Sequence, residues 1–267
     1  MSNAYSRRQF LALMGGSAAV LGLGLVGCGP SDDKAATSGD AAAKTYIVAT
    51  DTTFAPFEFT NESNEFVGID VDLLAAIAAK TGISYELNSL GFEAACAALE
   101  AGQADAVIAG MSITDEREEK YDFSDTYYDS YVSAAAKAGG SVTSLADLKG
   151  QKVAAKTGTQ SASWAESIEE EYGFEITYFD GSDLMYQDVL TGNSAACFED
   201  YPVMAYGVAQ GNGLTIIGED KETFSSPYGF AVLKGKNAEL IENFNKGLMA
   251  IKDSGKYDEI IAKYTTA

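Results

Sequence analysis

The sequence alternates short apolar runs with amphipathic runs at helical spacing, and this alternation limits the fold more than any other feature. In the first half, residues 46–50, 83–87 and 104–109 are predicted strands, separated by predicted helices over 70–81 and 92–101. Asparagine, aspartate and serine residues favour helix starts, and glycine favours helix ends. We therefore expect Asp70 to cap the first helix and Gly82 to end it. A β-α-β-α-β order is typical of an open α/β sheet, in which ligands bind at the carboxyl ends of the strands.

The second half of the chain repeats this order. Its predicted strands are residues 152–155, 175–179, 195–198 and 214–217, and its predicted helices are 161–172, 183–190 and 201–209.

Two extended stretches, residues 130–136 and 228–233, are predicted to cross between the halves, and the last helices are expected to pack back on the first half. The predicted fold is therefore an α/β protein with two α/β lobes joined by two hinge strands. Lobe 1 comprises residues 45–131 and 226–267, and lobe 2 comprises residues 132–225. Such a hinged pair of lobes is suited to enclosing a small ligand.

Composition excludes several classes of function. The 267 residues include no histidine, which rules out Ser-His-Asp and Cys-His catalysis and a histidine-ligated metal centre. The 18 basic residues against 39 acidic residues give a net charge of −21, and no basic block is present. This balance argues against binding to nucleic acid.

The N-terminus has the pattern of an export signal. Arg7 and Arg8 precede an apolar stretch over residues 11–27, which is too short for a typical membrane-spanning helix. It ends in Leu-Val-Gly before Cys28 and resembles the lipobox of bacterial lipoproteins. The alternative is an uncleaved anchor with an incidental cysteine, and both a twin-arginine and an ordinary secretory signal remain open.

These features predict a lipoprotein signal peptide over residues 1–27 and a lipid on Cys28. Residues 28–44 lack aromatic residues and periodicity, so they are expected to form a flexible tether. The protein is therefore expected outside the cytoplasm, held on the bacterial membrane by its N-terminal lipid.

Two further cysteines lie in the predicted lobes. Cys96 falls in an alanine-rich helical run of lobe 1 and Cys197 in an apolar strand of lobe 2. An oxidising compartment would permit a disulfide between them. Because they lie in different predicted lobes, we expect two free thiols instead.

Residues 110–117 form the first of three strand-end segments with binding chemistry. Thr114 is the expected N-cap of a short helix, and Arg117 stands three residues later, where a glutamate or glutamine would complete a capping box. A cation is unfavourable at the positive end of a helix dipole, so Arg117 is a functional candidate. Its guanidinium could hold a carboxylate through two hydrogen bonds. The alternative is a surface arginine paired with Asp115 or Glu118.

Residues 156–161, from Lys156 to Ser161, form the second segment. It joins a strand to a helix, so backbone N–H groups, Thr159 and Ser161 are directed toward the predicted binding site. Helix N-termini bind anions, although an ordinary helix cap is the alternative.

Residues 197–202 form the third segment, in which Glu199 and Asp200 end a buried strand. Asp200 could cap the following helix or face the site and hold an ammonium group. Together the three segments predict an amino-acid site, with aromatic walls supplied by residues 51–59 and by Phe92.

Several motifs, in this order and spacing, resemble the polar amino-acid substrate-binding proteins of ABC importers. The motifs are residues 49–51 with 56–57, residues 67–72, residues 110–117 and residues 122–124, and the resemblance spans about residues 45–265. Within that family the chain is most similar to the glutamine-binding proteins, through Asp51, Thr52, Phe54 and Lys156.

The resemblance implies the periplasmic-binding-protein type II fold, often called a Venus flytrap. It implies a monomer without cofactor, metal or catalytic activity, which captures a polar amino acid by hinge closure. Its partners would be an ABC permease and the ATPase of that importer.

The resemblance also implies a role for each candidate residue. Arg117, Ser112 and the N–H groups near Thr159 and Gln160 would hold the α-carboxylate of the ligand. Asp200 and the Gly110 carbonyl would hold the α-ammonium group, Phe54 and Phe92 would enclose the aliphatic part, and Asp51 and Lys156 would meet the polar end.

Glu199 departs from the family pattern, because glutamine-binding relatives carry histidine at its position. If Glu199 faces the ligand, then Asp51, Glu199 and Lys156 sum to −1 and favour lysine or arginine. If it pairs with Lys156 or faces solvent, a neutral amide is favoured. Glutamine is the expected ligand and lysine or arginine the alternative. A dehydratase that uses Glu199 and Lys156 as an acid–base pair is a further alternative.

Overall fold

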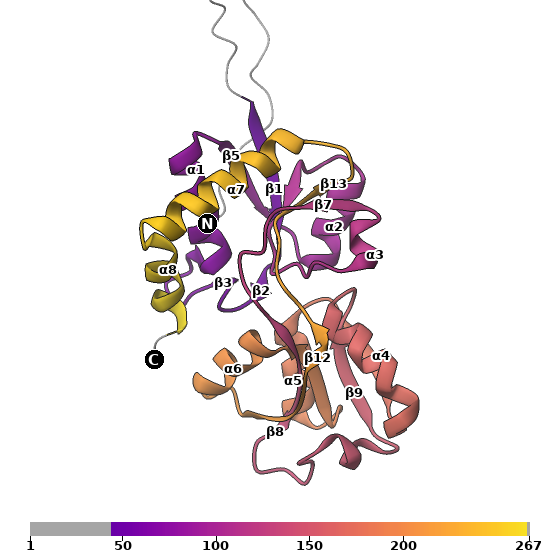
Figure 1. Cartoon of the computed structure of the whole chain (residues 1–267). Coiled ribbons are helices and arrows are strands. Elements are labelled where there is room, and N and C mark those ends of the chain that lie inside the picture. Colours follow the sequence, from indigo (N-terminus) through magenta and orange to yellow (C-terminus); the bar gives the residue numbers. More distant parts are fainter. Residues whose placement is uncertain (1–43, 266–267) are drawn as a thin grey trace, which may run out of the picture. The chain divides into compact units, whose positions relative to one another are not determined.

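The first lobe is built on a five-stranded sheet in the order β5-β1-β6-β13-β7 (Figure 1). In this computed structural model, which describes residues 44–265, β1 lies parallel to both β5 and β6, while β13 is antiparallel to β6 and β7. The strands are β1 (Thr45–Thr50), β5 (Ser84–Ser89), β6 (Ala106–Val107), β7 (Tyr121–Phe123) and β13 (Ala231–Leu233).

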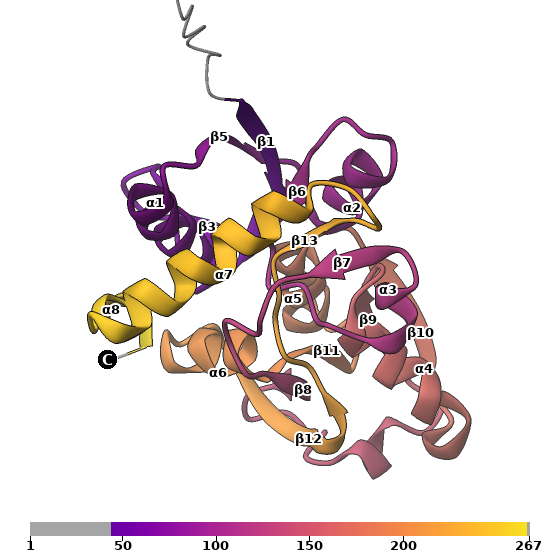
Figure 2. The same ribbon diagram turned by 45° about the horizontal axis from the view of Figure 1, so that its top comes forward.

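Helices cover both faces of this sheet because consecutive strand residues point to opposite sides. Val48 packs in a core with α1 (Ile69–Thr81), α7 (Ala238–Asp253) and α8 (Lys256–Thr265), and Figure 2 shows α7 lying across the sheet. Ala49 packs on the other face with α2 (Phe92–Glu100). The prediction that the last helices return to the first lobe is thus confirmed.

The second lobe has a similar sheet in the order β10-β9-β11-β8-β12, with β9 parallel to β10 and β11 and with β8 antiparallel to β11 and β12. Its helices again lie on both faces, in two separate clusters of buried side chains. Its elements are β8 (Tyr131–Lys137), η1 (Leu145–Leu148), β9 (Lys152–Lys156), α4 (Gln160–Tyr172), β10 (Glu175–Phe179), α5 (Ser182–Thr191), β11 (Ala196–Asp200), α6 (Tyr201–Ala209) and β12 (Leu214–Ser225).

Two chain segments connect the lobes, residues 124–130 and residues 226–230, and Figures 1 and 2 show them side by side. The extended stretches predicted as crossovers are displaced from this position. Most of residues 130–136 forms β8 of the second sheet, and residues 231–233 form β13 of the first. The pairing of these strands within the sheets satisfies backbone groups that a free connection would leave to solvent.

Three short strands near the first sheet were not predicted. They are β2 (Thr53–Phe54), β3 (Glu58–Thr60) and β4 (Phe66–Val67), which form a small antiparallel sheet. The short helix predicted after Thr114 is α3 (Asp115–Glu118), a single turn. The predicted strand over residues 104–109 is correspondingly shorter, since only β6 pairs within it.

Asp70 does not cap α1, contrary to the prediction. The N-cap is Gly68, and Asp70 lies inside the first turn with its side chain fully buried. The first N–H groups of α1 instead donate to the carbonyl oxygens of Pro56 and Phe57 at 2.9 Å, so no side-chain cap is required.

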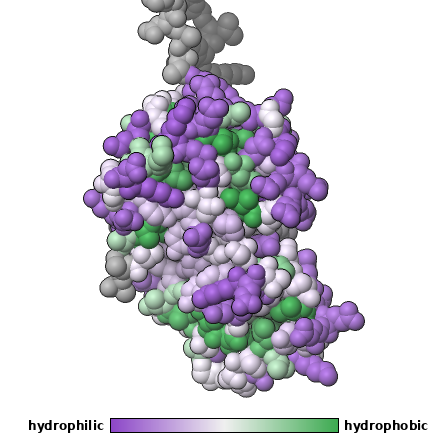
Figure 3. Space-filling model, in the orientation of Figure 1, coloured by the Kyte–Doolittle hydropathy of each residue, from purple (hydrophilic) through white to green (hydrophobic). Residues whose placement is uncertain are grey.

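Cys96 and Cys197 are free thiols in different lobes, as predicted. The predicted signal peptide, Cys28 and all of the predicted tether except Lys44 lie outside the described residues. Within residues 44–265, no helix is long and apolar enough to cross a membrane. Hydrophilic side chains cover much of the first lobe in the space-filling view, in keeping with the acidic composition (Figure 3).

The entry into α1 gives a test of the fold. Gly68 has φ of 144°, and a Cβ placed on it would lie 1.9 Å from the Phe57 carbonyl oxygen. We expect Gly68→Ala to lower the free energy of unfolding by more than about 2 kcal/mol in chemical denaturation. Gly82→Ala is the control: it also has a positive φ but nothing within 4 Å, so its cost should stay near about 1 kcal/mol. Equal losses in the two variants would contradict the packing of Gly68 on Phe57.

Candidate ligand-binding site

One pocket is lined by side chains of both lobes and gathers nearly all of the predicted site residues. Ten of the eleven predicted residues line it, Ala109 lines it without having been predicted, and Glu199 is the predicted residue that does not. The lining residues are Asp51, Phe54, Phe92, Ala109, Gly110, Ser112, Arg117, Lys156, Thr159, Gln160 and Asp200.

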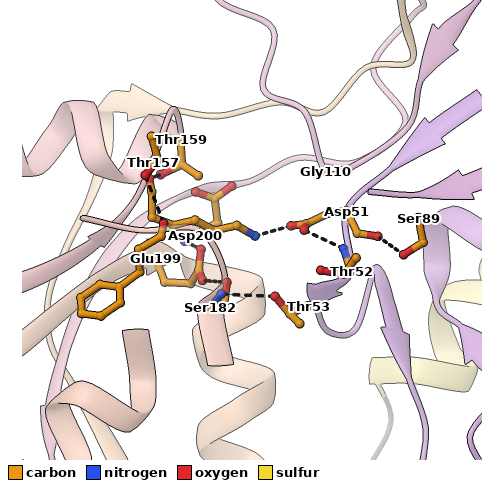
Figure 4. Close-up of polar contacts among 12 residues, drawn as sticks. Asp51, Thr52, Thr53, Ser89, Gly110, Thr157, Thr159, Ser182, Glu199 and Asp200 are labelled. Carbon is orange, nitrogen blue, oxygen red and sulfur yellow. Dashed lines mark hydrogen bonds and ion pairs between the residues drawn. The ribbon is translucent and has the colours of Figure 1, made fainter. Parts of the chain in front are cut away.

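Strand ends explain this convergence. Asp51 directly follows β1, whereas Lys156 ends β9 and Asp200 ends β11. The parallel strands of each lobe end at the same sheet edge, where loops carry their side chains to a common point. Figure 4 shows the Asp51 carboxylate directed from the first lobe toward side chains of the second.

Arg117 directs its guanidinium into the pocket. Thr114 caps α3 as predicted, with its side-chain oxygen accepting from the Arg117 backbone N–H at 3.2 Å. The guanidinium donates to the carbonyl oxygen of Ser112 at 2.8 Å and, across the lobes, to that of Gly158 at 2.9 Å. Its carbon lies 5.3 Å from the centre of the Phe92 ring. The predicted alternative, a surface arginine paired with Asp115 or Glu118, does not form.

The N-terminus of α4 supplies further donors to the same pocket. Thr159 is the N-cap, and its hydroxyl accepts from the Ala162 N–H at 3.1 Å and donates to the Lys156 carbonyl at 2.8 Å. Because both roles of the hydroxyl are occupied, Thr159 contributes to the pocket mainly through its backbone and through the positive end of the helix.

Asp200 is buried and takes the second of its two predicted orientations. Although it stands at the N-cap of α6, its side chain makes no capping hydrogen bond. Its carboxylate instead accepts from Ser161 at 2.5 Å and from Tyr228 at 2.6 Å. Burial raises the pKa of Asp200, and these two hydrogen bonds, followed by Arg117, oppose that rise.

Lys156 and Asp51 form an ion pair between the lobes, and each side chain is only 1% exposed. The Asp51 carboxylate also accepts from the Thr52 N–H at 2.6 Å. The Lys156 nitrogen lies 5.2 Å from the centre of the Phe54 ring, which forms one wall of the pocket. This end of the pocket therefore contains one donor cation and one acceptor anion in nearly dry surroundings.

Glu199 points away from the pocket because its neighbour Asp200 points into it. Its carboxylate accepts from Ser182 at 2.7 Å (Figure 4). It also accepts from Tyr186 at 3.1 Å and from the Asp200 N–H at 3.1 Å. Burial raises the pKa of Glu199 to about 7, although the charge of Lys156 acts in the opposite direction.

Gly110 occupies a position that only glycine fits. Its φ is 52°, and a Cβ would lie 2.3 Å from the Phe54 ring. The close approach brings the Gly110 backbone to the pocket surface beside the aromatic wall.

Sequence analysis did not predict the partners that orient the charged groups, apart from Ser161, which was placed at the site without a partner. Tyr228 reaches Asp200 from a connection between the lobes, while Ser182 and Tyr186 hold Glu199 from α5. These are common residue types at unremarkable spacings, so no local pattern identifies them. Within residues 44–265, no group of three or more Cys, Asp or Glu side chains is placed to hold a metal ion.

Comparison with known proteins agrees with this architecture. Residues 46–267 match the model of the bacterial extracellular solute-binding proteins, family 3. The chain belongs to this family.

Named relatives of this solute-binding protein include two curated proteins. The arginine-binding extracellular protein ArtP of Bacillus subtilis is 30% identical and aligns over 93% of this chain and 95% of its own length. The lysine/arginine/ornithine-binding periplasmic protein of Escherichia coli is 31% identical, over 86% of this chain and 91% of its own.

Solved structures of an ancestral arginine-binding protein are also similar to this solute-binding protein. The structure bound to arginine has a TM-score of 0.75 at 40% identity and covers 83% of this chain and 98% of that one. The structure bound to glutamine has the same TM-score at 39% identity and covers 84% of this chain and 98% of that one.

The buried Glu199 carboxyl predicts a pH dependence of stability. Its pKa is raised above the ordinary value of 4.5, so the folded solute-binding protein retains a proton that the unfolded chain releases. This contribution is fully present below about pH 4.5 and is lost as the pH rises toward about 7. The unfolding free energy of the wild type should therefore fall between about pH 5 and about pH 8. In Glu199→Gln this drop should be smaller, by up to about 3 kcal/mol.

Chemical denaturation at the two pH values measures this drop. Glu86→Gln, which alters an exposed glutamate on β5, controls for the loss of a carboxylate as such. An unchanged drop in Glu199→Gln would contradict the protonation of Glu199 in the folded state.

Proposed function

We propose that this solute-binding protein captures a polar L-amino acid, with glutamine favoured, for an ABC importer. The observation that carries the proposal is the division of charge in the pocket. A guanidinium and a helix N-terminus face one carboxylate, Asp200, and a separate ion pair lies at the other end. A zwitterion with a polar but uncharged side chain complements all of these groups.

The α-carboxylate of the ligand belongs at Arg117. The two guanidinium nitrogens now donate to carbonyl oxygens, and a carboxylate is a better acceptor because the hydrogen bonds become charge-assisted. The N-terminus of α4, with Thr159 and Gln160, adds backbone donors from the second lobe. A ligand held in this way contacts both lobes, so its binding favours their closure.

The α-ammonium group belongs at Asp200. Burial disfavours the charged form of this carboxyl, whereas a cation within hydrogen-bonding distance favours it. The Gly110 carbonyl is a second acceptor on the lobe opposite. Ser112 would help Arg117 to hold the α-carboxylate, while Phe54 and Phe92 would enclose the aliphatic part of the ligand.

Asp51 and Lys156 select the ligand side chain. An amide has a donor for Asp51 and an acceptor for Lys156, and it adds no charge to a pair that sums to zero. A guanidinium or ammonium group would meet the buried Lys156 cation, which is costly in these surroundings. We therefore favour glutamine and assign Glu199 a supporting role behind Lys156, not a direct contact with the ligand.

Arginine or lysine is the second candidate. The named relatives are arginine-binding and lysine/arginine/ornithine-binding proteins, and the ancestral arginine-binding protein has been solved with either arginine or glutamine. A cationic ligand could be held if Glu199 were ionised, because its charge acts on Lys156.

The remaining parts of the proposal concern the working context. The moving units would be residues 45–131 with 226–267 and residues 132–225, in a monomer. A lipid on Cys28 and a tether over residues 28–44 would hold the protein on the outer side of the membrane beside its permease. The ligand handles bind without chemical change, so no catalytic role is assigned to Glu199 or Lys156.

Arg117→Ala tests the amino-acid site. The loss of a charge-assisted pair should weaken glutamine binding by about 100-fold or more, which isothermal titration calorimetry measures directly. Arg117→Lys keeps the charge without the two-pronged geometry and should fall between the wild type and Arg117→Ala. Lys120→Ala, at an exposed cation near α3, is the control. Nearly unchanged binding in Arg117→Ala would overturn the carboxylate assignment.

Lys156→Met tests the choice of side chain. Removing the cation leaves Asp51 unpaired, so affinity for glutamine should fall about tenfold or more, while affinity for arginine should rise. Titration of both proteins with glutamine, arginine and lysine gives the comparison. A wild-type protein that prefers arginine to glutamine would identify the second candidate as correct, and a wild type that binds none of the amino acids would reject the proposed function.

A further inference from the structure

Two acidic side chains, Glu58 and Asp70, lie fully buried in the first lobe behind the ligand site. Glu58 belongs to β3 and Asp70 to the first turn of α1, so neither lines the pocket. Burial of two neighbouring acids in an apolar core is costly, and the function described above does not use them.

Asp70 is bonded directly to the backbone of the pocket. One of its carboxylate oxygens accepts from the Gly110 N–H at 2.8 Å and from the Tyr127 hydroxyl at 2.8 Å. Gly110 lines the pocket with φ of 52°, a conformation that few residues adopt. The Asp70 carboxylate therefore fixes the orientation of the Gly110 peptide and, with it, a wall of the site.

The carboxyl oxygens of Asp70 and Glu58 that lack a hydrogen-bond donor indicate where a proton lies. The other oxygen of Asp70 and both oxygens of Glu58 have no hydrogen-bond donor among the described residues. The two carboxyl groups nevertheless lie within hydrogen-bonding reach of each other. A proton on Glu58 would be donated to the free oxygen of Asp70 and would satisfy both groups at once.

The surrounding charges place this proton on Glu58. Asp70 is stabilised as the anion by two donors and by the N-terminus of α1. Glu58 faces Asp70 and, at longer range, Asp51, and the cation that opposes their effect, Lys156, is paired with Asp51. Tyr127, which donates its hydroxyl to Asp70, is held neutral because burial and Asp70 raise its pKa well above the ordinary value.

We propose that Asp70 is a positioning residue of the ligand site, and that Glu58 keeps it in place by sharing one proton with it. Asp70 acts through Gly110, whose peptide it orients, and Glu58 acts through Asp70. The proposal adds two residues to the site that do not touch the ligand.

The shared proton makes the site sensitive to alkaline pH. Burial, then the negative charges of Asp70 and Asp51, raise the pKa of Glu58 well above its ordinary range, while burial raises the pKa of Asp70 to about 6. Both the unsatisfied carboxyl oxygens and these opposing charges therefore favour one proton on the pair. Above the pKa of Glu58 that proton passes to water, two carboxylates face each other, and the resulting repulsion displaces Asp70 from Gly110.

Infrared spectroscopy of the full chain tests the shared proton without a ligand. The difference between the wild type and Glu58→Gln at about pH 7 should contain the carbonyl stretch of a protonated carboxylic acid. Its absence at that pH would overturn the shared proton. The infrared measurement tests the shared proton even if the protein does not bind glutamine. The binding measurement described next rests on the proposed function.

The pH profile of glutamine binding tests the link to the site. As the pH rises from neutral into the alkaline range, the wild-type Kd should rise more than that of Glu58→Gln, whose amide donates to Asp70 at every pH. The ammonium group of glutamine titrates alike with both proteins, so the ratio of the two Kd values isolates Glu58. A constant ratio would overturn the coupling of Glu58 to the ligand site.

Asp70→Asn tests the positioning role itself. It should weaken glutamine binding about tenfold, because the charge-assisted bond to Gly110 is lost. Asp72→Asn is the matched control on α1, since Asp72 bonds to Lys263 and Tyr264 instead of the pocket. Equal binding by Asp70→Asn and Asp72→Asn would reject the positioning role. If Asp70→Asn does not fold, the pH dependence of the ratio between the wild-type and Glu58→Gln Kd values tests the coupling of the acidic pair to the site.

Discussion

The buried ion pair between Lys156 and Asp51 is the interaction on which the rest of the site depends. It joins the two lobes at the back of the pocket, where neither side chain reaches solvent. With this pair neutral, Arg117 and Asp200 are left to balance each other across the same space. Four charged groups thus share a nearly dry pocket without a net charge. The proposed ligand, a zwitterion with a polar, uncharged end, would leave this balance unchanged.

The architecture brings these charges together through ordinary sheet geometry. Parallel strands of both lobes end at the pocket, so residues distant in sequence meet there. Behind this surface a further set of residues holds the charged groups in place. Tyr228 orients Asp200, Ser182 holds Glu199, and Asp70 holds Gly110. In the proposed function, selectivity would depend on these buried partners as well as on the groups that touch the ligand.

Sequence alone predicted most of the longer strands and helices and most of the pocket lining, because these follow from periodicity and from strand-end position. It failed where tertiary contacts decide. Asp70 fits the pattern of a helix cap, but the backbone carbonyls of Pro56 and Phe57 already satisfy the start of α1. The direction of Glu199 was left open, since it depends on Ser182 and Tyr186, which no local pattern connects to it.

A crystal structure of the protein with L-glutamine would test the central claim most directly. The account predicts the α-carboxylate on Arg117, the α-ammonium group on Asp200 and the side-chain amide between Asp51 and Lys156. A glutamine bound with its α-carboxylate on Lys156 would contradict the account. So would a glutamine bound anywhere outside the pocket that the two lobes form.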